Sequence, residues 1–179
     1  MQAASDEPAL RQRLNEISEV ASQAVEEVRQ IINNLRPYQL GRLGLTQAIR
    51  AIVNRATENS SILFASHVDD IDSFFDKDAE IHIYRIVQEA VNNILKHSQA
   101  TEATVVVKMN SDCVSISIRD NGKGFELGTL DFASAAGPGH GLSSIAERVR
   151  ILGGKWELDS APAQGTRLTI EIPKPVVRQ

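Results

Sequence analysis

Residues 84–97 read YRIVQEAVNNILKH, and this stretch joins an apolar helix face to a stripe of polar side chains. The polar stripe consists of Arg85, Glu89, Asn92, Asn93 and Lys96, which lie three or four residues apart and are therefore neighbours on one face of a helix. A mostly apolar helix that carries one acid, two amides and two bases along one face calls for a chemical explanation. Its apolar residues recur at helical spacing and predict a buried face: Ile83, Ile86, Val87, Ala90, Val91, Ile94 and Leu95.

The composition narrows the class of protein. The 179 residues are 42% hydrophobic, enough for one well-buried domain with an appendage. The net charge of -4, with both signs spread along the chain, argues against nucleic-acid binding. A single cysteine, Cys113, fits a reducing compartment. No apolar run approaches the ~18 residues of a membrane span. We therefore expect a cytoplasmic chain without membrane contact, which leaves open a membrane-anchored parent protein.

A long helix is predicted over residues 8–36. Pro8 suits its first turn, and Pro37 ends it. Such a helix cannot bury its apolar seam alone, so it packs either on its own domain or, as we expect, in a dimeric helical bundle. The stripe is widened by Val20, Val25 and Ile32, which suits a four-helix bundle better than a two-stranded coil. The seam alternates spacings of four and three residues: Leu10, Leu14, Ile17, Ala21, Ala24, Val28, Ile31 and Leu35.

The remaining pattern is mixed and predicts an α/β domain. We expect helices at 46–58, 76–97 and 142–152, and strands at 61–68, 103–109, 113–120, 155–160 and 166–173. The predicted organisation is a dimerisation helix at 1–37, a linker at 38–45, an α/β domain at 46–173 and a tail at 174–179.

A glycine-rich loop lies in the second half of this domain, between the predicted strand at 113–120 and the predicted helix at 142–152. It opens with RDNGKGF (119–125) after a predicted strand and closes with GPGHGLSSIAERV (137–149) running into a helix. Backbone N–H groups at a helix start favour an anion, so this arrangement indicates phosphate binding. The chain has neither a P-loop motif nor a dinucleotide-binding unit. Six of the eleven glycines lie here: Gly122, Gly124, Gly128, Gly137, Gly139 and Gly141.

The polar stripe fits a nucleotide that travels with magnesium. An asparagine oxygen can be one of the few protein ligands of Mg²⁺, and Lys96 can meet a phosphate as a point charge. Glu89 can orient or deprotonate a nucleophile, or hold a metal-bound water. Asp120, at a strand end, can accept a hydrogen bond from the amino group of adenine.

Four segments in order resemble the ATP-binding boxes of the GHKL superfamily, which includes gyrase, heat-shock chaperone, histidine kinase and mismatch-repair ATPases. They are EAVNNILKH (89–97), RDNGKGF, GHGLSSIAERV (139–149) and GTRLTIEIP (165–173). The residues of these segments are most similar to those of sensor histidine kinases of the nitrate-sensor and thermosensor type. Two further segments carry the same resemblance: LRP (35–37) and LGL (43–45). The resemblance implies a two-layer α/β sandwich, the Bergerat-type ATP-binding fold, with a long N-terminal dimerisation helix.

The resemblance also implies roles for individual residues. Asn93 matches the magnesium-binding asparagine, and Glu89 matches the water-activating acid of the ATPase branches. Asp120 matches the aspartate that reads adenine, with Thr166 near the base. The remaining implied ATP contacts are Lys96, His97, Gly122, Gly124, Gly139, His140, Gly141 and Leu142. The cofactors are then ATP and Mg²⁺, with residues 125–138 as a lid.

One departure concerns the phosphoacceptor. Histidine kinases phosphorylate a histidine on the first helix of their bundle, yet none of the four histidines lies within residues 8–36. We therefore expect a kinase catalytic domain that donates phosphate to a histidine outside this chain. Its partners would be a second copy of the parent and a response regulator with a helix-turn-helix output. The alternatives are a serine kinase that inhibits a sigma factor, and a non-catalytic nucleotide-sensing dimerisation module.

Overall fold

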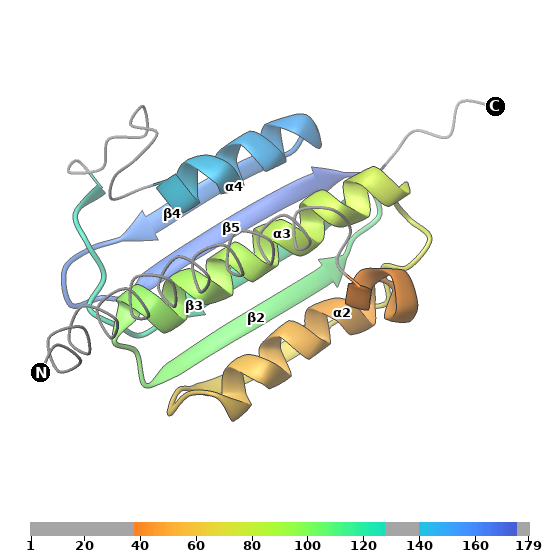
Figure 1. Cartoon of the computed structure of the whole chain (residues 1–179). Coiled ribbons are helices and arrows are strands. Elements are labelled where there is room, and N and C mark those ends of the chain that lie inside the picture. The colour runs from red at the N-terminus through yellow and green to blue at the C-terminus, as the bar shows by residue number, and fades with distance from the viewer. Residues whose placement is uncertain (1–37, 128–139, 175–179) are drawn as a thin grey trace, which may run out of the picture. The chain divides into compact units, whose positions relative to one another are not determined.

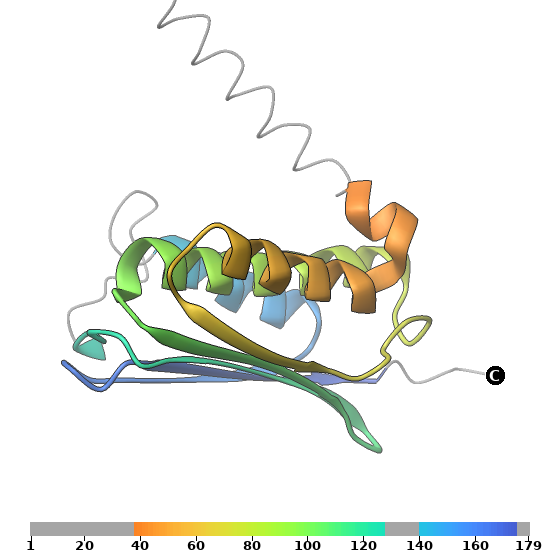
Figure 2. The same cartoon turned by 90° about the horizontal axis from the view of Figure 1, so that it is seen from below.

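Three helices cover one face of a five-stranded sheet (Figure 1). The computed structural model describes residues 38–127 and 140–174. The helix expected at 8–36, most of the glycine-rich loop and the last five residues lie outside the described residues. Seen from below, the helices form one layer and the sheet the other (Figure 2). This arrangement confirms the predicted two-layer α/β sandwich.

The sheet is mixed, in the order β1-β2-β3-β5-β4. Its strands are β1 (Leu63–Val68), β2 (Glu102–Met109), β3 (Cys113–Asp120), β4 (Lys155–Ser160) and β5 (Thr166–Pro173). β1 and β2 are parallel because helix α3 crosses between them, and every other pair is antiparallel. The predicted strands at 113–120, 155–160 and 166–173 agree with the structure, and the other two differ by one or two residues at their start.

Alternation along the strands separates a core face from an open face. In β3, Val114, Ile116 and Ile118 are buried, while Arg119 on the other face is exposed. The apolar faces of the helices close the core above these side chains. The largest fully buried residues come from both layers: Leu45, Ile49, Val53, Ile71, Ile83, Ile86, Val87, Val91, Ile116, Ile145, Ile170 and Ile172.

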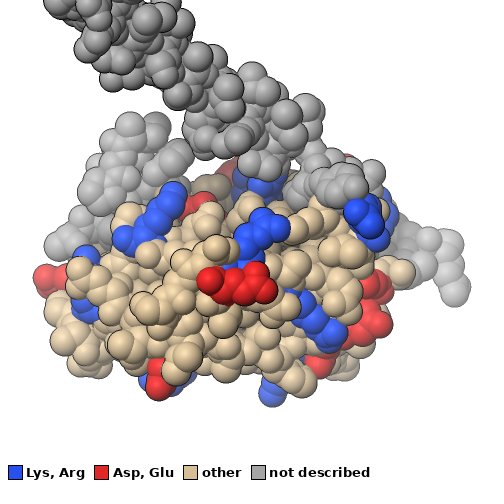
Figure 3. Space-filling view, turned by 60° about the horizontal axis from the view of Figure 1, so that its bottom comes forward, with Lys and Arg blue, Asp and Glu red and all other residues tan. Residues whose placement is uncertain are grey.

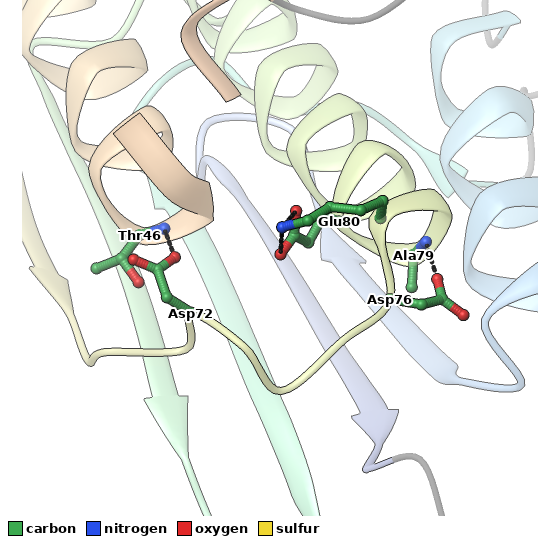
Figure 4. Close-up of polar contacts among 6 residues, drawn as sticks. Thr46, Asp72, Asp76, Ala79 and Glu80 are labelled. Atoms are coloured by element: carbon green, nitrogen blue, oxygen red, sulfur yellow. Dashed lines mark hydrogen bonds and ion pairs between the residues drawn. The ribbon is translucent and has the colours of Figure 1, made fainter. Parts of the chain in front are cut away.

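Helix α2 (Tyr38–Glu58) contains a break at Gly44, whose φ of 77° lies in the left-handed region. Asp72 restarts the helix because its Oδ1 accepts the backbone N–H of Thr46 at 2.9 Å (Figure 4). The buried Thr46 hydroxyl in turn accepts the N–H of Ile71 at 3.0 Å. The segment that we predicted as a linker is thus helical on both sides of one glycine, and this helix is fixed to the loop after β1.

Helix α3 (Lys77–Asn93) carries the polar stripe and begins at an Asp76 cap, whose Oδ1 accepts the N–H of Ala79 at 2.8 Å (Figure 4). The predicted helix ran to residue 97. In the structure the α-helix ends at Asn93 and continues as a π-helical segment, Ile94–Ser98, closed by Gln99 in a left-handed conformation. This wider turn carries Lys96 and His97.

Helix α4 (His140–Ile151) packs against α3 (Figure 1). Arg148 Nη1 lies 3.4 Å from His82 Nδ1, near the start of α3. Gly141, in the first turn of α4, approaches Glu89 and Asn93, near the end of α3. The two helices therefore run in opposite directions, and the N-terminus of α4 meets the polar stripe.

The surface bears charges of both signs. On the face shown in Figure 3, Lys and Arg side chains are interspersed with Asp and Glu, and most of the visible surface is uncharged. Within residues 38–127 and 140–174, no helix is long and apolar enough to cross a membrane.

Candidate functional site

A cavity of about 720 Å³ lies between α3, the start of α4 and the core face of the sheet. Its size is that of a small-molecule site. Most of the residues singled out from the sequence line it: Glu89, Asn93, Lys96, His97, Asp120, Gly124, Gly141, Leu142 and Thr166. These positions span almost eighty residues of sequence, so the fold gathers them into one place.

Three predicted residues do not line the cavity in the described structure. Gly122 lies behind its wall and donates its N–H to Asp120 Oδ1 at 2.8 Å. Gly139 lies outside the described residues. His140 begins α4, but its side chain is not described.

The oxygen-rich end of the cavity lies where α4 begins. A Cβ on Gly141 would collide with Glu89 Oε1 and lie 3.2 Å from Asn93 Oδ1, so the helix start touches both side chains. The side chains of Glu89 and Asn93 have no hydrogen bond or ion pair to another described residue. Asn92, the other amide of the polar stripe, also lines the cavity.

This oxygen set fits magnesium in its usual protein setting. Mg²⁺ takes one or two protein oxygens and completes its octahedron with water and phosphate. No group of three or more His, Cys, Asp or Glu side chains in the described structure could hold a metal ion by itself. Asn93 Oδ1 and Glu89 are instead neighbouring oxygen ligands whose side chains bond to no other residue in the described part of the chain, which suits a metal that arrives with a phosphate.

Asp120, at the end of β3, closes another part of the cavity and is only 5% exposed. Its Oδ1 accepts the N–H of Gly122 at 2.8 Å, and Thr166 is the residue paired with Asp120 in β5. Burial raises the pKa of Asp120 above its usual 3.8, while the backbone N–H groups of Gly122 and Thr166 act to lower it. A buried carboxylate with room for a further donor is suited to reading a polar group on a ligand.

The turn between β4 and β5 supports this part of the cavity. Gly165 has a φ of 73°, and a Cβ there would collide with the backbone oxygen of Asp120. Ser160, which ends β4, bonds across the turn to Gly165 and Thr166 and also receives the N–H of Phe125. Sequence reasoning did not single out Ser160 or Leu158, because period-two alternation marks them only as strand positions. It included Lys123 and Phe125 only as members of the RDNGKGF segment, without a role in lining the cavity.

The π-helical segment shapes the side wall. The buried Ser98 hydroxyl donates to the Ile94 carbonyl at 2.7 Å and accepts the N–H of Ala100 at 3.0 Å. The Ser98 carbonyl accepts the N–H of Lys123 at 2.7 Å, which ties the segment to the loop after β3. Lys96 and His97 are exposed on this wall at the cavity mouth. π-helical turns often occur at functional sites.

An α/β sandwich with such a cavity between its helices and sheet defines a nucleotide-binding domain of the GHKL class. Residues 78–176 match the family described as histidine kinase-, DNA gyrase B- and HSP90-like ATPases. Because this match covers more than half of the chain, the chain belongs to that family. Residues 1–40 match a further family described as histidine kinase.

Individual relatives narrow the branch of the family. The oxygen sensor histidine kinase NreB of Staphylococcus carnosus is 31% identical over 168 residues, which cover 94% of this chain and 47% of NreB. The sensor histidine kinase LiaS of Bacillus subtilis is 29% identical over 161 residues, covering 90% of this chain and 43% of LiaS. The chain thus spans less than half the length of these relatives and contains the catalytic ATP-binding domain found in sensor histidine kinases.

Solved structures agree on the fold. The histidine kinase domain of a blue-light activated histidine kinase from Erythrobacter litoralis has a TM-score of 0.60 at 19% identity, covering 73% of this chain and 63% of that chain. The ATP binding domain of PrrB from Mycobacterium tuberculosis has a TM-score of 0.57 at 22% identity, and the match covers 74% of this chain and 95% of that chain. At these identities the likeness concerns the fold.

Proposed function

We propose that this chain binds ATP with Mg²⁺ in the cavity and donates the γ-phosphate to a histidine outside the chain. The observation that carries the proposal is the set of polar groups that line one cavity. It includes the buried Asp120 carboxylate, and also Glu89 and Asn93, whose side chains bond to no other described residue and lie against the first turn of α4. A ligand that fits these groups has a hydrogen-bond donor and a metal-bound anion, as ATP has.

Each lining residue then has a role that its position supports. Asp120 accepts the amino group of adenine, with Thr166 beside it and Gly122 and Gly124 shaping that wall. Asn93 is the magnesium ligand, and Glu89 orients the reacting group or a metal-bound water. The phosphates lie near Lys96 and His97 and against the start of α4, formed by His140, Gly141 and Leu142, where the helix dipole favours an anion. The resemblance adds Gly139, which precedes this helix in the sequence.

Catalysis of this kind consists mostly of positioning and charge neutralisation. Magnesium supplies the counter-charge to the phosphates, and this chain's own groups fix the base and the metal in one cavity. The acceptor histidine would lie on a bundle helix of the parent kinase, which dimerises through residues 1–37. The phosphoryl group would pass, in the cytoplasm, to a response regulator with a helix-turn-helix DNA-binding output.

The direct test is calorimetric titration of the chain with ATP, with and without Mg²⁺. Wild-type protein is expected to bind ATP more tightly with magnesium. Asp120→Ala should abolish binding of either form, and Asn93→Ala should remove the magnesium-dependent part. Asn54→Ala and Asp159→Ala change exposed residues of the same types and should leave binding unaltered. A folded wild-type chain that binds no ATP would refute the proposal.

Phosphotransfer is tested by adding the histidine-bearing bundle segment of a related kinase together with radiolabelled ATP. Label on the histidine that requires Glu89 and Asn93 would support the kinase. Normal ATP binding without any transfer would favour the nucleotide-sensing module, and label on the serine of an anti-anti-sigma protein would favour the serine kinase.

A further inference from the structure

Arg85 is the member of the polar stripe that does not line the cavity. Its guanidinium lies over the ring of Tyr84, 5.8 Å from the centroid, and its Nη1 donates to Gln88 Oε1 at 2.6 Å. Its Nη2 is buried and has no hydrogen-bond partner among the described residues. A buried donor without a partner costs free energy. Arg85 therefore calls for an acceptor that the described part of the chain does not supply.

A second arginine approaches α3 from α4. Arg148 Nη1 lies 3.4 Å from Nδ1 of His82, near the start of α3. A guanidinium only donates, so His82 Nδ1 accepts this bond and the ring proton of the neutral histidine is on Nε2. Burial lowers the pKa of Arg85, and the charge of Arg148 acts in the same direction. The two arginines are thus close enough for their charges to repel.

No carboxylate balances these charges in the described structure. Glu147, beside Arg148 in the sequence, pairs instead with Arg150, whose Nη2 donates to Oε1 at 2.6 Å. Glu89, four residues after Arg85, lines the cavity and meets Gly141. Two positive charges and several unused N–H donors remain, which we call the donor cluster: His82, Arg85 and Arg148. A carboxylate complements it, because a carboxylate is negative and only accepts.

The donor cluster lies along the same helix seam as the oxygen-rich end of the cavity. Helices α3 and α4 are side by side (Figure 1), with Glu89 near Gly141 and His82 near Arg148. Each of these contacts is seven residues from the other on both helices, and seven helical residues span about 10 Å. Arg85 falls between the two contacts. The surface next to the proposed phosphate position therefore carries an unbalanced positive charge.

We infer that the donor cluster is a docking site for a carboxylate of the segment that carries the acceptor histidine. The inference deepens the proposed function and rests on it. The histidine has to reach the γ-phosphate from outside the cavity, so its segment covers the adjoining surface. A helical segment along the seam places this carboxylate within about two turns of the histidine. The ion pair then sets the register of the segment, so that the histidine arrives opposite the phosphate.

A purely structural role for Arg85 predicts something different. Loss of its contacts with Gln88 and Tyr84 would disturb α3, and with it Glu89 and Asn93. The affinity for ATP would then fall, and no change in the partner segment could restore it. A docking role leaves ATP affinity and the maximal transfer rate unaltered and weakens only the binding of the segment. The two roles are therefore distinguished by KM and kcat.

The experiment uses the whole chain and, as a probe, the histidine-bearing bundle segment of a related kinase carrying a fluorophore. Anisotropy gives the Kd of the segment, and radiolabelled ATP gives KM and kcat for transfer. Arg85→Gln and Arg148→Gln should each raise Kd and KM by roughly tenfold, as for one charge-assisted hydrogen bond. Both should keep kcat and ATP affinity within about twofold of wild type. Arg150→Gln, the matched control, removes the same charge from a residue already paired with Glu147 and should change none of these values.

A charge exchange identifies the partner group. Arg85→Glu should weaken segment binding further than Arg85→Gln. A lysine in place of one segment carboxylate within two turns of the histidine should restore most of the affinity for Arg85→Glu, while it weakens binding to wild type. A wild type that does not bind the segment, unaltered binding by both glutamine variants, a parallel loss of ATP affinity, or no restoring lysine would overturn the inference. Segment binding that follows these expectations without phosphotransfer would instead refute the proposed function.

Discussion

At the scale of single residues, Asp120 is buried, yet its carboxylate can accept more hydrogen bonds than it does. Burial is the largest influence on its carboxyl group and raises the pKa, although the backbone N–H groups of Gly122 and Thr166 act to lower it. A buried carboxylate of this kind lowers the stability of the fold, and proteins keep such a group where it has a function. The cost is visible in the pH dependence of folding.

Asp120→Asn should flatten part of that pH dependence. A carboxyl whose folded-state pKa is raised binds its proton more tightly in the native state. Its stabilising contribution is complete below about 3.8 and is lost as pH rises through the folded pKa. The unfolding free energy of wild type should therefore fall relative to Asp120→Asn as pH rises above 3.8. Urea denaturation of both proteins from pH 4 to pH 7 measures this difference, and parallel curves would contradict the assignment.

Gly165 supports Asp120 from the turn before β5, and its replacement should be costly. Gly165→Ala combines a φ of 73° with a collision against backbone, and a loss of about 2 to 5 kcal/mol is expected. Gly153 has a similar φ of 64° but open space around it, so Gly153→Ala should cost only about 1 to 2 kcal/mol. Urea denaturation compares the two, and equal losses would mean that the close approach to Asp120 does not matter.

A residue could be located from the sequence where a local pattern marks it, and was missed where its contacts join residues far apart in the sequence. Glu89, Asn93 and Asp120 could be located because they follow helical spacing or end a strand. The bond of Ser160 to Phe125 joins residues 35 positions apart, and no local pattern encodes it. The π-helical turn at 94–98 was missed for a related reason. Its residues are ordinary helix formers, and the wider turn is held by Ser98 and its contact with Lys123.

At the scale of elements, the site depends on how closely α4 approaches α3. Gly141→Ala would push a methyl group into Glu89, whose flexible side chain can move aside. The fold should persist, within about 1 kcal/mol of wild type, because alanine favours helices. Magnesium-dependent ATP affinity should fall about tenfold, as for one lost charge-assisted contact. Calorimetry and thermal melting test both parts.

The control for this prediction is Gly41→Ala, in α2, where a Cβ meets nothing within 4 Å. That variant should gain up to about 1 kcal/mol of stability without any change in ATP affinity. If Gly141→Ala behaves in the same way, the contact between α4 and Glu89 is not needed for binding.

The break in α2 is stabilised by a cap from a distant loop. Asp72→Ala leaves the N–H of Thr46 without its partner and should cost about 0.5 to 2 kcal/mol. Asp76→Ala removes the cap of α3 and should cost a similar amount. Asp159→Ala, on the open face of the sheet, should stay within about 0.5 kcal/mol of wild type. Urea denaturation ranks the three, and an Asp72 variant as stable as the Asp159 variant would contradict the capping role.

At the scale of the whole molecule, the structural domain is larger than the segment that matches the ATPase family. The match begins at residue 78, which leaves out α2 and β1. Yet Leu45, Ile49, Val53 and Ile71 are among the largest fully buried side chains. Burying four such side chains contributes roughly 6 to 12 kcal/mol, comparable with the whole stability of a typical domain. The compact unit instead begins at Gln39.

Truncation therefore should separate the two boundaries. A fragment of residues 39–174 keeps every described core residue and every residue that lines the cavity, so it should unfold cooperatively and bind ATP within about twofold of the full chain. A fragment of residues 78–174 keeps every residue that lines the cavity but loses helix α2 and the edge strand β1. It should show no cooperative transition in urea and no ATP binding. Ile49→Ala in the longer fragment removes part of the same packing and should cost about 2 to 5 kcal/mol without changing ATP affinity in the folded protein. Cooperative unfolding of the 78–174 fragment would contradict the assignment of α2 and β1 to the core.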